Sequence, residues 1–99
     1  MKEREIMMEI KFGNNEFYIE NEQKERLGEI TFYDKNPTTI VIDHTYVHET
    51  LRGQSIARTL VNHVVRFARE YNKKIIPQCS YADKVLSSSE EFKDVIKKD

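Results

Sequence analysis

The sequence predicts an α+β domain with a mostly antiparallel sheet and one β-α-β crossover, in the order β-β-β-β-α-β-α. Three observations lead to this prediction. Four short segments rich in β-branched and aromatic residues follow one another closely within residues 5–47. An amphipathic helical period begins at Ile56, and a short apolar segment, residues 73–77, follows it.

The front half of the chain is expected to fold as an antiparallel meander. Residues 5–12 and 16–21 are separated by Gly and Asn, which is a hairpin signal. Residues 26–33 form the third expected strand, in which Gly28 marks a bulge or a close backbone approach. A turn then leads into residues 38–47, the strongest strand of the sequence because it is rich in β-branched residues.

The rear half of the chain is expected to hold two helices and one strand. From Ile56 onward, apolar residues recur at helical spacing and basic residues face outward. Residues 73–77 form a short strand, and the strand-helix-strand unit predicts a right-handed crossover to a parallel neighbour. Residues 87–98 are expected to form the last helix, with Ser87 and Glu90 at capping-box spacing.

The parallel joint predicts where a ligand lies. It falls near the loop of residues 44–53 and the end of the 73–77 strand. Where parallel strands end and diverge, loops and helix N-termini open a crevice, which is the usual ligand position in such sheets. We therefore expect the functional site at this end of the sheet.

Length and composition limit the class of protein. At 99 residues the chain is expected to be one domain, residues 1–99, and its 38% hydrophobic content excludes a disordered tail. The net charge of −1 gives no reason to expect nucleic acid or an anionic membrane. Residues 52–74 are locally basic, so a compact anion fits there. The single cysteine, the charged start and the lack of a long apolar run predict a cytoplasmic location.

The segment RGQSIA, residues 52–57, stands where the loop meets the main helix. A helix N-terminus presents unpaired backbone N–H groups and a partial positive charge, which attract phosphate. Gly53 lets the backbone come close to a ligand, and Arg52 and Arg58 add positive charge. The residues alone also fit an ordinary turn glycine, a capping serine at Ser55 and two solvated arginines.

Three ordered segments together resemble a known family. They are TYV at 45–47, RGQSIA at 52–57 and PQCSY at 77–81. The pattern resembles very small, single-domain proteins of the GNAT superfamily of acetyl-CoA-dependent N-acetyltransferases, over about residues 40–97. The resemblance therefore implies a GNAT-like sheet.

The match to the superfamily signature, Gln/Arg-x-x-Gly-x-Gly/Ala, has one departure. Arg52 matches its first position and Ala57 its last. Between them, Ser55 stands at the position where the signature has its glycine. A serine keeps the backbone N–H but loses some conformational freedom.

The resemblance implies a role for each matching residue. Val47 would offer backbone groups to the pantetheine arm and the acetyl carbonyl. The N–H groups from Gln54 to Ala57 would hold the pyrophosphate, the two arginines would pair with phosphate, and Gly53 would keep the loop clear of the ligand. The implied cofactor-binding residues are Val47, Arg52, Gly53, Gln54, Ser55, Ile56, Ala57 and Arg58.

Three residues are candidates for catalysis. Cys79 could accept the acetyl group or protonate the departing coenzyme thiolate; the alternative is a small buried hydrophobe. Tyr81 could be the general acid that protonates the leaving thiolate, a role that a tyrosine often has in this superfamily, and the alternative is a lid over the core. His44 could take a proton from an incoming ammonium, and the alternative is a sheet histidine facing solvent or another strand.

No metal site is expected. His48 and Glu49 resemble the start of a zinc-protease motif, but its fifth position is Arg52 rather than histidine. His63 lies at the helix boundary and needs no functional role.

The resemblance implies an acetyl-CoA-dependent N-acetyltransferase. The paired N-terminal helices of larger GNAT enzymes are not evident here, which predicts an open acceptor groove suited to a protein or peptide amine. The expected partners are acetyl-CoA and that amine, with no nucleic acid and no membrane. The alternative is a non-catalytic acyl-CoA-binding or protein-interaction module. Without the resemblance, the residues support only an anion-binding α+β domain.

Overall fold

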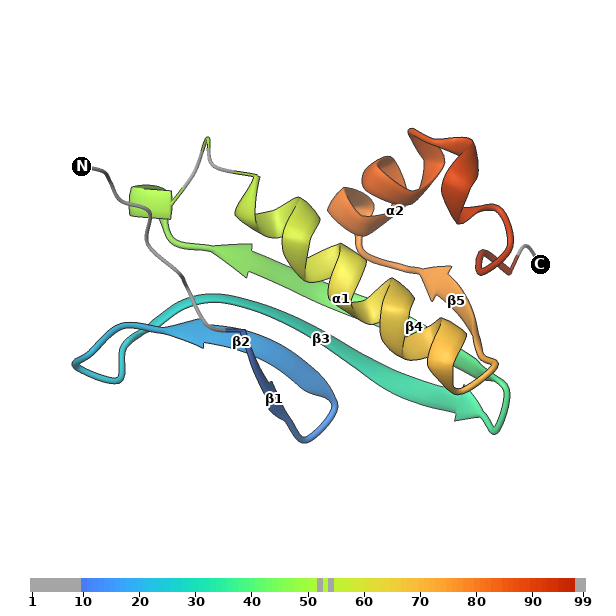
Figure 1. Ribbon diagram of the computed structural model, residues 1–99, viewed down its shortest axis with the longest axis horizontal. Coiled ribbons are helices and arrows are strands. Elements are labelled where there is room, and N and C mark those ends of the chain that lie inside the picture. Colours follow the sequence, from blue (N-terminus) through green and yellow to red (C-terminus); the bar gives the residue numbers. More distant parts are fainter. Residues whose placement is uncertain (1–9, 52, 54, 98–99) are drawn as a thin grey trace.

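The computed structural model describes residues 10–51, 53 and 55–97, and this part of the chain forms a five-stranded sheet with two α-helices (Figure 1). In chain order the elements are β1 (Lys11–Gly13), β2 (Glu16–Glu20), β3 (Arg26–Asn36), β4 (Thr39–Val47), the 3₁₀ turn η1 (Glu49–Leu51), α1 (Ile56–Glu70), β5 (Lys74–Pro77), α2 (Ser80–Ser87) and the 3₁₀ turn η2 (Glu90–Phe92). The predicted α+β class and element order are confirmed.

The strands lie in the sheet in their order along the chain. The first three junctions are antiparallel, whereas β4 and β5 pair in parallel from Thr39↔Lys74 to Ile42↔Pro77. The connection between these two parallel strands is α1, which confirms the predicted crossover. Of the predicted first strand, residues 5–9 lie outside the described part of the chain.

One face of the sheet packs against α1 (Figure 1). Strand alternation points Ile19, Ile30 and Ile42 to this face, and all three side chains are almost fully buried. Burying one such side chain stabilises the fold by about 1.5–3 kcal/mol relative to leaving it exposed. Gly28 lies on the same face, where an added Cβ would be 3.5 Å from Leu60 Cδ1, so the expected close approach is that of α1. The helix contributes Leu60, Val61, Val64, Val65 and Ala68 to the core.

The end of α1 is fixed by Asn72, which adopts a left-handed conformation with φ 58°. Its N–H donates to Arg69 O (3.3 Å), and the N–H of Lys73 donates to Ala68 O (2.7 Å). These two bonds satisfy carbonyls that the helix would otherwise leave open, as in a Schellman motif. The chain is thereby turned directly into β5.

The prediction of a helix over residues 87–98 is wrong. Ser87 is the last residue of α2, which begins at Ser80, and its hydroxyl lies 3.5 Å from Asp83 Oδ1. The cap is instead Ser89, whose side chain accepts a hydrogen bond from Glu91 N–H at the start of η2 (3.3 Å). The serine pattern does mark a helical turn, but two residues later and for a single turn.

The C-terminal segment follows β5 instead of coiling. Ile75 N–H donates to Val95 O (2.6 Å) and Lys97 N–H donates to Ile75 O (2.9 Å). An edge strand leaves a row of backbone groups to be satisfied, and the end of the chain satisfies those of Ile75. Phe92 and Val95 are both buried in the core, which holds the segment against the sheet.

In the described part of the chain, neither helix combines the length and the apolar composition that crossing a membrane requires.

The burial of Phe92 makes the C-terminal segment part of the folding unit. Replacing Phe92 with Ala should lower the free energy of unfolding by about 3–5 kcal/mol, the usual cost of a buried Phe-to-Ala change. Urea denaturation followed by circular dichroism measures this loss. The control is Tyr33→Ala, because Tyr33 is 42% exposed and should cost much less. Equal losses for the two variants would contradict a structural role for this segment.

Candidate functional site

The site begins where β5 leaves β4. The last pair of the parallel ladder is Ile42↔Pro77, and Ile42 O accepts the N–H groups of Gln78 and Cys79, both at 3.0 Å. Beyond this point β4 runs on to Val47, while the segment that follows β5 turns into α2. A gap therefore opens between the end of β4 and the start of α2, at the predicted end of the sheet.

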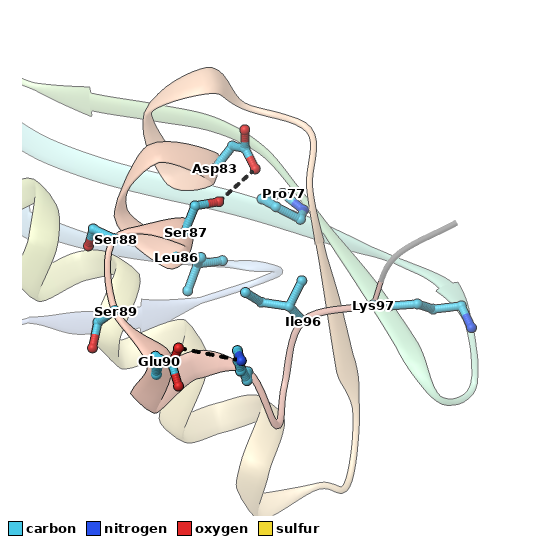
Figure 2. Close-up of a pocket in the computed structure, with 10 residues that line it drawn as sticks. Pro77, Asp83, Leu86, Ser87, Ser88, Ser89, Glu90, Ile96 and Lys97 are labelled. Carbon is cyan, nitrogen blue, oxygen red and sulfur yellow. Dashed lines mark hydrogen bonds and ion pairs between the residues drawn. The ribbon is translucent and has the colours of Figure 1, made fainter.

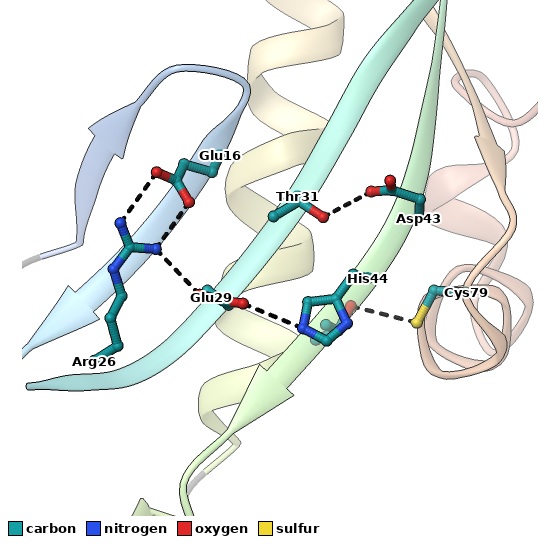
Figure 3. Close-up of polar contacts among 8 residues, drawn as sticks. Glu16, Arg26, Glu29, Thr31, Asp43, His44 and Cys79 are labelled. Atoms are coloured by element: carbon teal, nitrogen blue, oxygen red, sulfur yellow. Dashed lines mark hydrogen bonds and ion pairs between the residues drawn. The ribbon is translucent and has the colours of Figure 1, made fainter.

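A β-bulge at Asp43 sets which side chains face this gap. Thr31 pairs with His44 and Phe32 pairs with Ile42, so Asp43 is the extra residue of β4. The Thr31 hydroxyl donates to Asp43 Oδ1 at 2.6 Å (Figure 3). Because one residue is inserted, Thr45 returns to the face on which Ile42 lies, and His44 points to the opposite, outer face.

The backbone of β4 also turns toward the gap. His48 N–H donates to Leu27 O at 2.8 Å, so that residue faces β3. Backbone groups alternate sides along a strand, and those of Thr45 and Val47 therefore face away from β3, on the side where β5 has departed.

A cleft of about 330 Å³ lies in this gap. Its lining comes from the end of β4, the loop after η1, the first turn of α1 and the first turn of α2. These residues are Thr45, Val47, Leu51, Gly53, Ser55, Ile56, Ala57 and Tyr81. Six of them were predicted as site residues, and they come together from segments up to 34 positions apart, as between Val47 and Tyr81.

The N-terminus of α1 opens toward this cleft. Its first internal hydrogen bond is from Thr59 N–H to Ser55 O (3.0 Å), so the N–H groups of Ile56, Ala57 and Arg58 have no acceptor within the helix. Ser55 is the N-cap, yet its side chain makes no capping hydrogen bond. The site thus offers three N–H groups and the positive end of the helix dipole to an anion.

Ser55 and Gly53 both adopt left-handed backbone conformations, with φ 61° and 86°. Nothing lies within 4 Å of a Cβ added at Gly53, so the backbone angle and not space favours glycine there. A serine at positive φ costs about 1–2 kcal/mol relative to an unstrained residue. Ser55 therefore holds the conformation that the glycine of the superfamily signature would adopt freely. Arg52 and Gln54 lie outside the described residues.

Three of the basic residues in the segment 52–74 interact with groups away from the cleft. Arg69 pairs with Asp94 (2.8 Å), Lys73 pairs with Asp34 (3.2 Å), and Lys74 donates to the carbonyl of Asp94. Arg58 is exposed and has no ion-pair partner among the described residues. Of the described cations in this stretch, Arg58 alone lies in the first turn of α1, beside the open N–H groups.

Cys79, the N-cap residue of α2, is not among the residues that line the cleft, but it contacts one of them. Its Sγ is 3.5 Å from Oγ1 of Thr45, which itself lines the cleft. Burial acts to raise the pKa of the thiol, but the hydroxyl of Thr45 and the backbone N–H groups of Ala82, Tyr81 and Thr45 together lower it below its ordinary value.

Tyr81 and His44 end up on different sides of β4. Tyr81 lines the cleft, is 38% exposed, and its hydroxyl has no hydrogen-bond partner in the described part of the chain. His44 lies outside the cleft, on the outer face, where its Nε2 is 3.2 Å from Glu29 Oε2 (Figure 3). Arg26 joins Glu29 (3.1 Å) to Glu16 (2.8 Å), and its hydrogen bond is the main cause that lowers the pKa of Glu16.

Sequence reasoning gave no role to Thr45, Leu51 or Glu29. Thr45 stood within the quoted TYV segment, but the bulge that turns it toward the cleft and Cys79 has no sequence signal. Glu29 is joined to His44 only by the pairing of β3 with β4. Nothing in the sequence places either contact.

A larger hollow of about 860 Å³ lies elsewhere, between α2, η2 and the C-terminal segment (Figure 2). Several of its polar side chains interact with each other: the Ser87 hydroxyl lies 3.5 Å from the Asp83 carboxylate, and Lys93 forms an ion pair with Glu90 (3.5 Å). None of the predicted site residues lines it. Across the described residues, no three His, Cys, Asp or Glu side chains gather as a metal site would require.

The fold and the cleft define a class of protein: an α+β domain that presents diverging parallel strands and an open helix N-terminus to an extended anionic ligand. A family model described as GCN5-related N-acetyltransferase matches residues 16–95. Because this match spans most of the chain, the protein belongs to the GCN5-related N-acetyltransferase family. The resemblance drawn from the three sequence segments is confirmed.

Solved structures share this fold. A GCN5-like candidate N-acetyltransferase from Staphylococcus aureus is 41% identical, with a TM-score of 0.79 over 91% of this chain and 88% of that chain. A GNAT-family N-acetyltransferase from Escherichia coli, in complex with CoA, has a TM-score of 0.55 at 18% identity over 63% of this chain and 38% of that chain. A GNAT-family acetyltransferase from Elizabethkingia anophelis, with acetyl-CoA bound, gives 0.54 at 21% identity over 63% and 40%. No curated protein matches the chain.

The surroundings of Cys79 predict a reactive thiol. Alkylation of Cys79 by iodoacetamide should begin at lower pH than that of a free cysteine, because the lowered pKa raises the thiolate fraction at any given pH. Thr45→Val removes the hydroxyl and should slow alkylation near neutral pH about fivefold, the equivalent of one hydrogen bond. The rate is measured by intact mass against pH. Thr31→Val, on the outer face, is the control and should leave the profile unchanged. A Thr45 variant with the wild-type profile would contradict this role.

Proposed function

We propose that this protein transfers an acetyl group from acetyl-CoA to an amine, and that the cleft between β4, α1 and α2 holds the coenzyme. The convergence of the open α1 N-terminus, the end of β4 beyond its last pair with β5, and Tyr81 on one cleft carries the proposal. Membership of the N-acetyltransferase family supports it. The CoA and acetyl-CoA complexes of the two structural relatives support the choice of coenzyme.

The N-terminus of α1 fits the phosphate end of the coenzyme. The N–H groups of Ile56, Ala57 and Arg58 are open, the helix dipole adds partial positive charge, and the Arg58 side chain adds a full one. Gly53 and Ser55 shape the preceding loop through their left-handed conformations. The phosphate roles proposed for Arg52 and Gln54 rest on the sequence signature alone.

The open end of β4 fits the arm of the coenzyme and its acetyl group. Acetyl-CoA supplies the acetyl group as a thioester. Val47 would orient the arm through its backbone, and backbone groups facing the gap would polarise the acetyl carbonyl. Tyr81, which lines the cleft, would donate a proton to the leaving sulfur, and Cys79 is the second candidate donor.

The acceptor amine would come from the outer face of the sheet. His44 is the proposed base for its proton, and Glu29 holds the imidazole by the contact of 3.2 Å. The His44 side chain is 52% exposed and the neighbouring Tyr46 is also exposed, so a large acceptor has access. We therefore propose a protein or peptide amine as the acceptor, and the cytoplasm as the location.

The proposal predicts that acetyl-CoA stabilises the fold. A ligand at about 100 times its Kd adds about 2.7 kcal/mol to the free energy of unfolding, which for a domain of 99 residues raises Tm by roughly 10 °C. Thermal melting with and without acetyl-CoA measures this shift. The absence of a shift at saturating acetyl-CoA would refute the proposal.

Arg58→Ala should raise the Kd of acetyl-CoA about fivefold, the cost of losing one exposed charge contact. Arg66→Ala is the matched control, because Arg66 is also an exposed arginine of α1 but lies two turns further along. Titration calorimetry measures both constants. Equal effects of the two substitutions would place the phosphates elsewhere.

Tyr81→Phe separates binding from chemistry. Loss of a positioned general acid should lower kcat about 100-fold, while the Kd of acetyl-CoA stays near the wild-type value because the ring still lines the cleft. Turnover is measured on a panel of peptide amines by release of the coenzyme thiol. Unchanged kcat would remove Tyr81 from the mechanism. Binding without turnover on any amine would favour a non-catalytic acyl-CoA-binding module.

A further inference from the structure

A second surface of the molecule is unusually apolar. Phe12 and Tyr71 are the two most exposed large hydrophobic residues in the described part of the chain, at 60% and 58%. Both contact Phe67, with ring centroids 6.0 Å and 4.9 Å apart, and Phe12 also contacts Phe17 at 5.1 Å. We call these four residues the aromatic patch. It continues into the core, since Phe17 is buried and contacts Phe32.

A hollow of about 310 Å³ lies within the aromatic patch. The α1 residues that line it include His63, Arg66 and Glu70, which with Phe67 are spaced i, i+3, i+4 and i+7 and so form one stripe of the helix. Exposed apolar surface rimmed by charged residues is typical of an interaction site. Phe67 lies eleven residues after Ile56, about 16 Å along the helix axis, so the patch is remote from the coenzyme cleft.

The rim of the aromatic patch carries two side chains of opposite charge that are not paired with described residues. Arg66 and Glu70 are exposed, and neither makes an ion pair or a side-chain hydrogen bond with any residue that the structure describes. Arg69 differs, because it is held by Asp94 and by the carbonyl of Glu91. The rim therefore presents one positive and one negative side chain, one helical turn apart.

We propose that the aromatic patch binds the same patch of a second copy of this chain, with the two α1 helices antiparallel across a two-fold axis. In that arrangement Arg66 of each copy meets Glu70 of the other, so one pair of residues supplies two intermolecular ion pairs. A two-fold interface must be self-complementary, and this surface carries both charges, a hollow and two protruding rings. The coenzyme clefts lie at the other ends of the helices, so this inference does not depend on the proposed function.

Charge reversal tests the arrangement. The full-length protein should show a concentration-dependent monomer–dimer equilibrium in sedimentation equilibrium. Arg66→Glu alone and Glu70→Arg alone each place like charges opposite one another and should raise the dimer Kd about tenfold or more. The double variant R66E/E70R restores opposite charges in the swapped order, and its dimer Kd should return to within about threefold of wild type. An equimolar mixture of the two single variants should likewise form a heterodimer.

Further variants locate the apolar part of the interface. Tyr71→Ser should weaken the dimer, while Tyr33→Ser, at another exposed tyrosine, should not. Far-UV circular dichroism and a cooperative thermal melt verify that each variant is folded. A chain that stays monomeric at the highest soluble concentration overturns the proposal. A dimer that single reversals leave unchanged, or that the double variant does not restore, overturns it as well.

Discussion

The carbonyl of Ile42 is the point on which the site depends. It accepts two N–H groups, those of Gln78 and Cys79, and it does so at the last parallel pair between β4 and β5. These bonds end the ladder and fix the start of α2 against β4. Tyr81, the one described residue of α2 that lines the cleft, takes its position from this junction.

The bulge at Asp43 gives the junction its chemistry. Without the extra residue, the side chain of Thr45 would face outward and that of His44 would face α1. The bulge instead turns Thr45 toward Cys79, where its hydroxyl and N–H favour the thiolate against the cost of burial. It also sends His44 outward to Glu29. Two of the candidate proton-transfer groups, Tyr81 and His44, are thereby separated by the strand itself.

The proposed anion site is built from backbone more than from side-chain charge. Three of the lysines and arginines that make residues 52–74 basic are bound to groups in other elements, and of the two other described ones, Arg58 and Arg66, only Arg58 lies at the start of α1. The open N–H groups of the first turn remain. Ser55 keeps a left-handed conformation that costs about 1–2 kcal/mol, and the surrounding fold sustains it at the rim of the cleft.

The sequence by itself determined the order of elements, the crossover and the family, because strand alternation, helical period and short motifs are local patterns. It also placed Val47, Gly53, Ser55 and Ala57 at one site. Only the tertiary structure decided the fate of residues 87–98: the open edge of β5 bonds to that segment, and burial of Phe92 outweighs its helical pattern. The position of His44 depends equally on the fold, since a one-residue bulge reverses the faces of a strand and its pairing partner is distant in the chain.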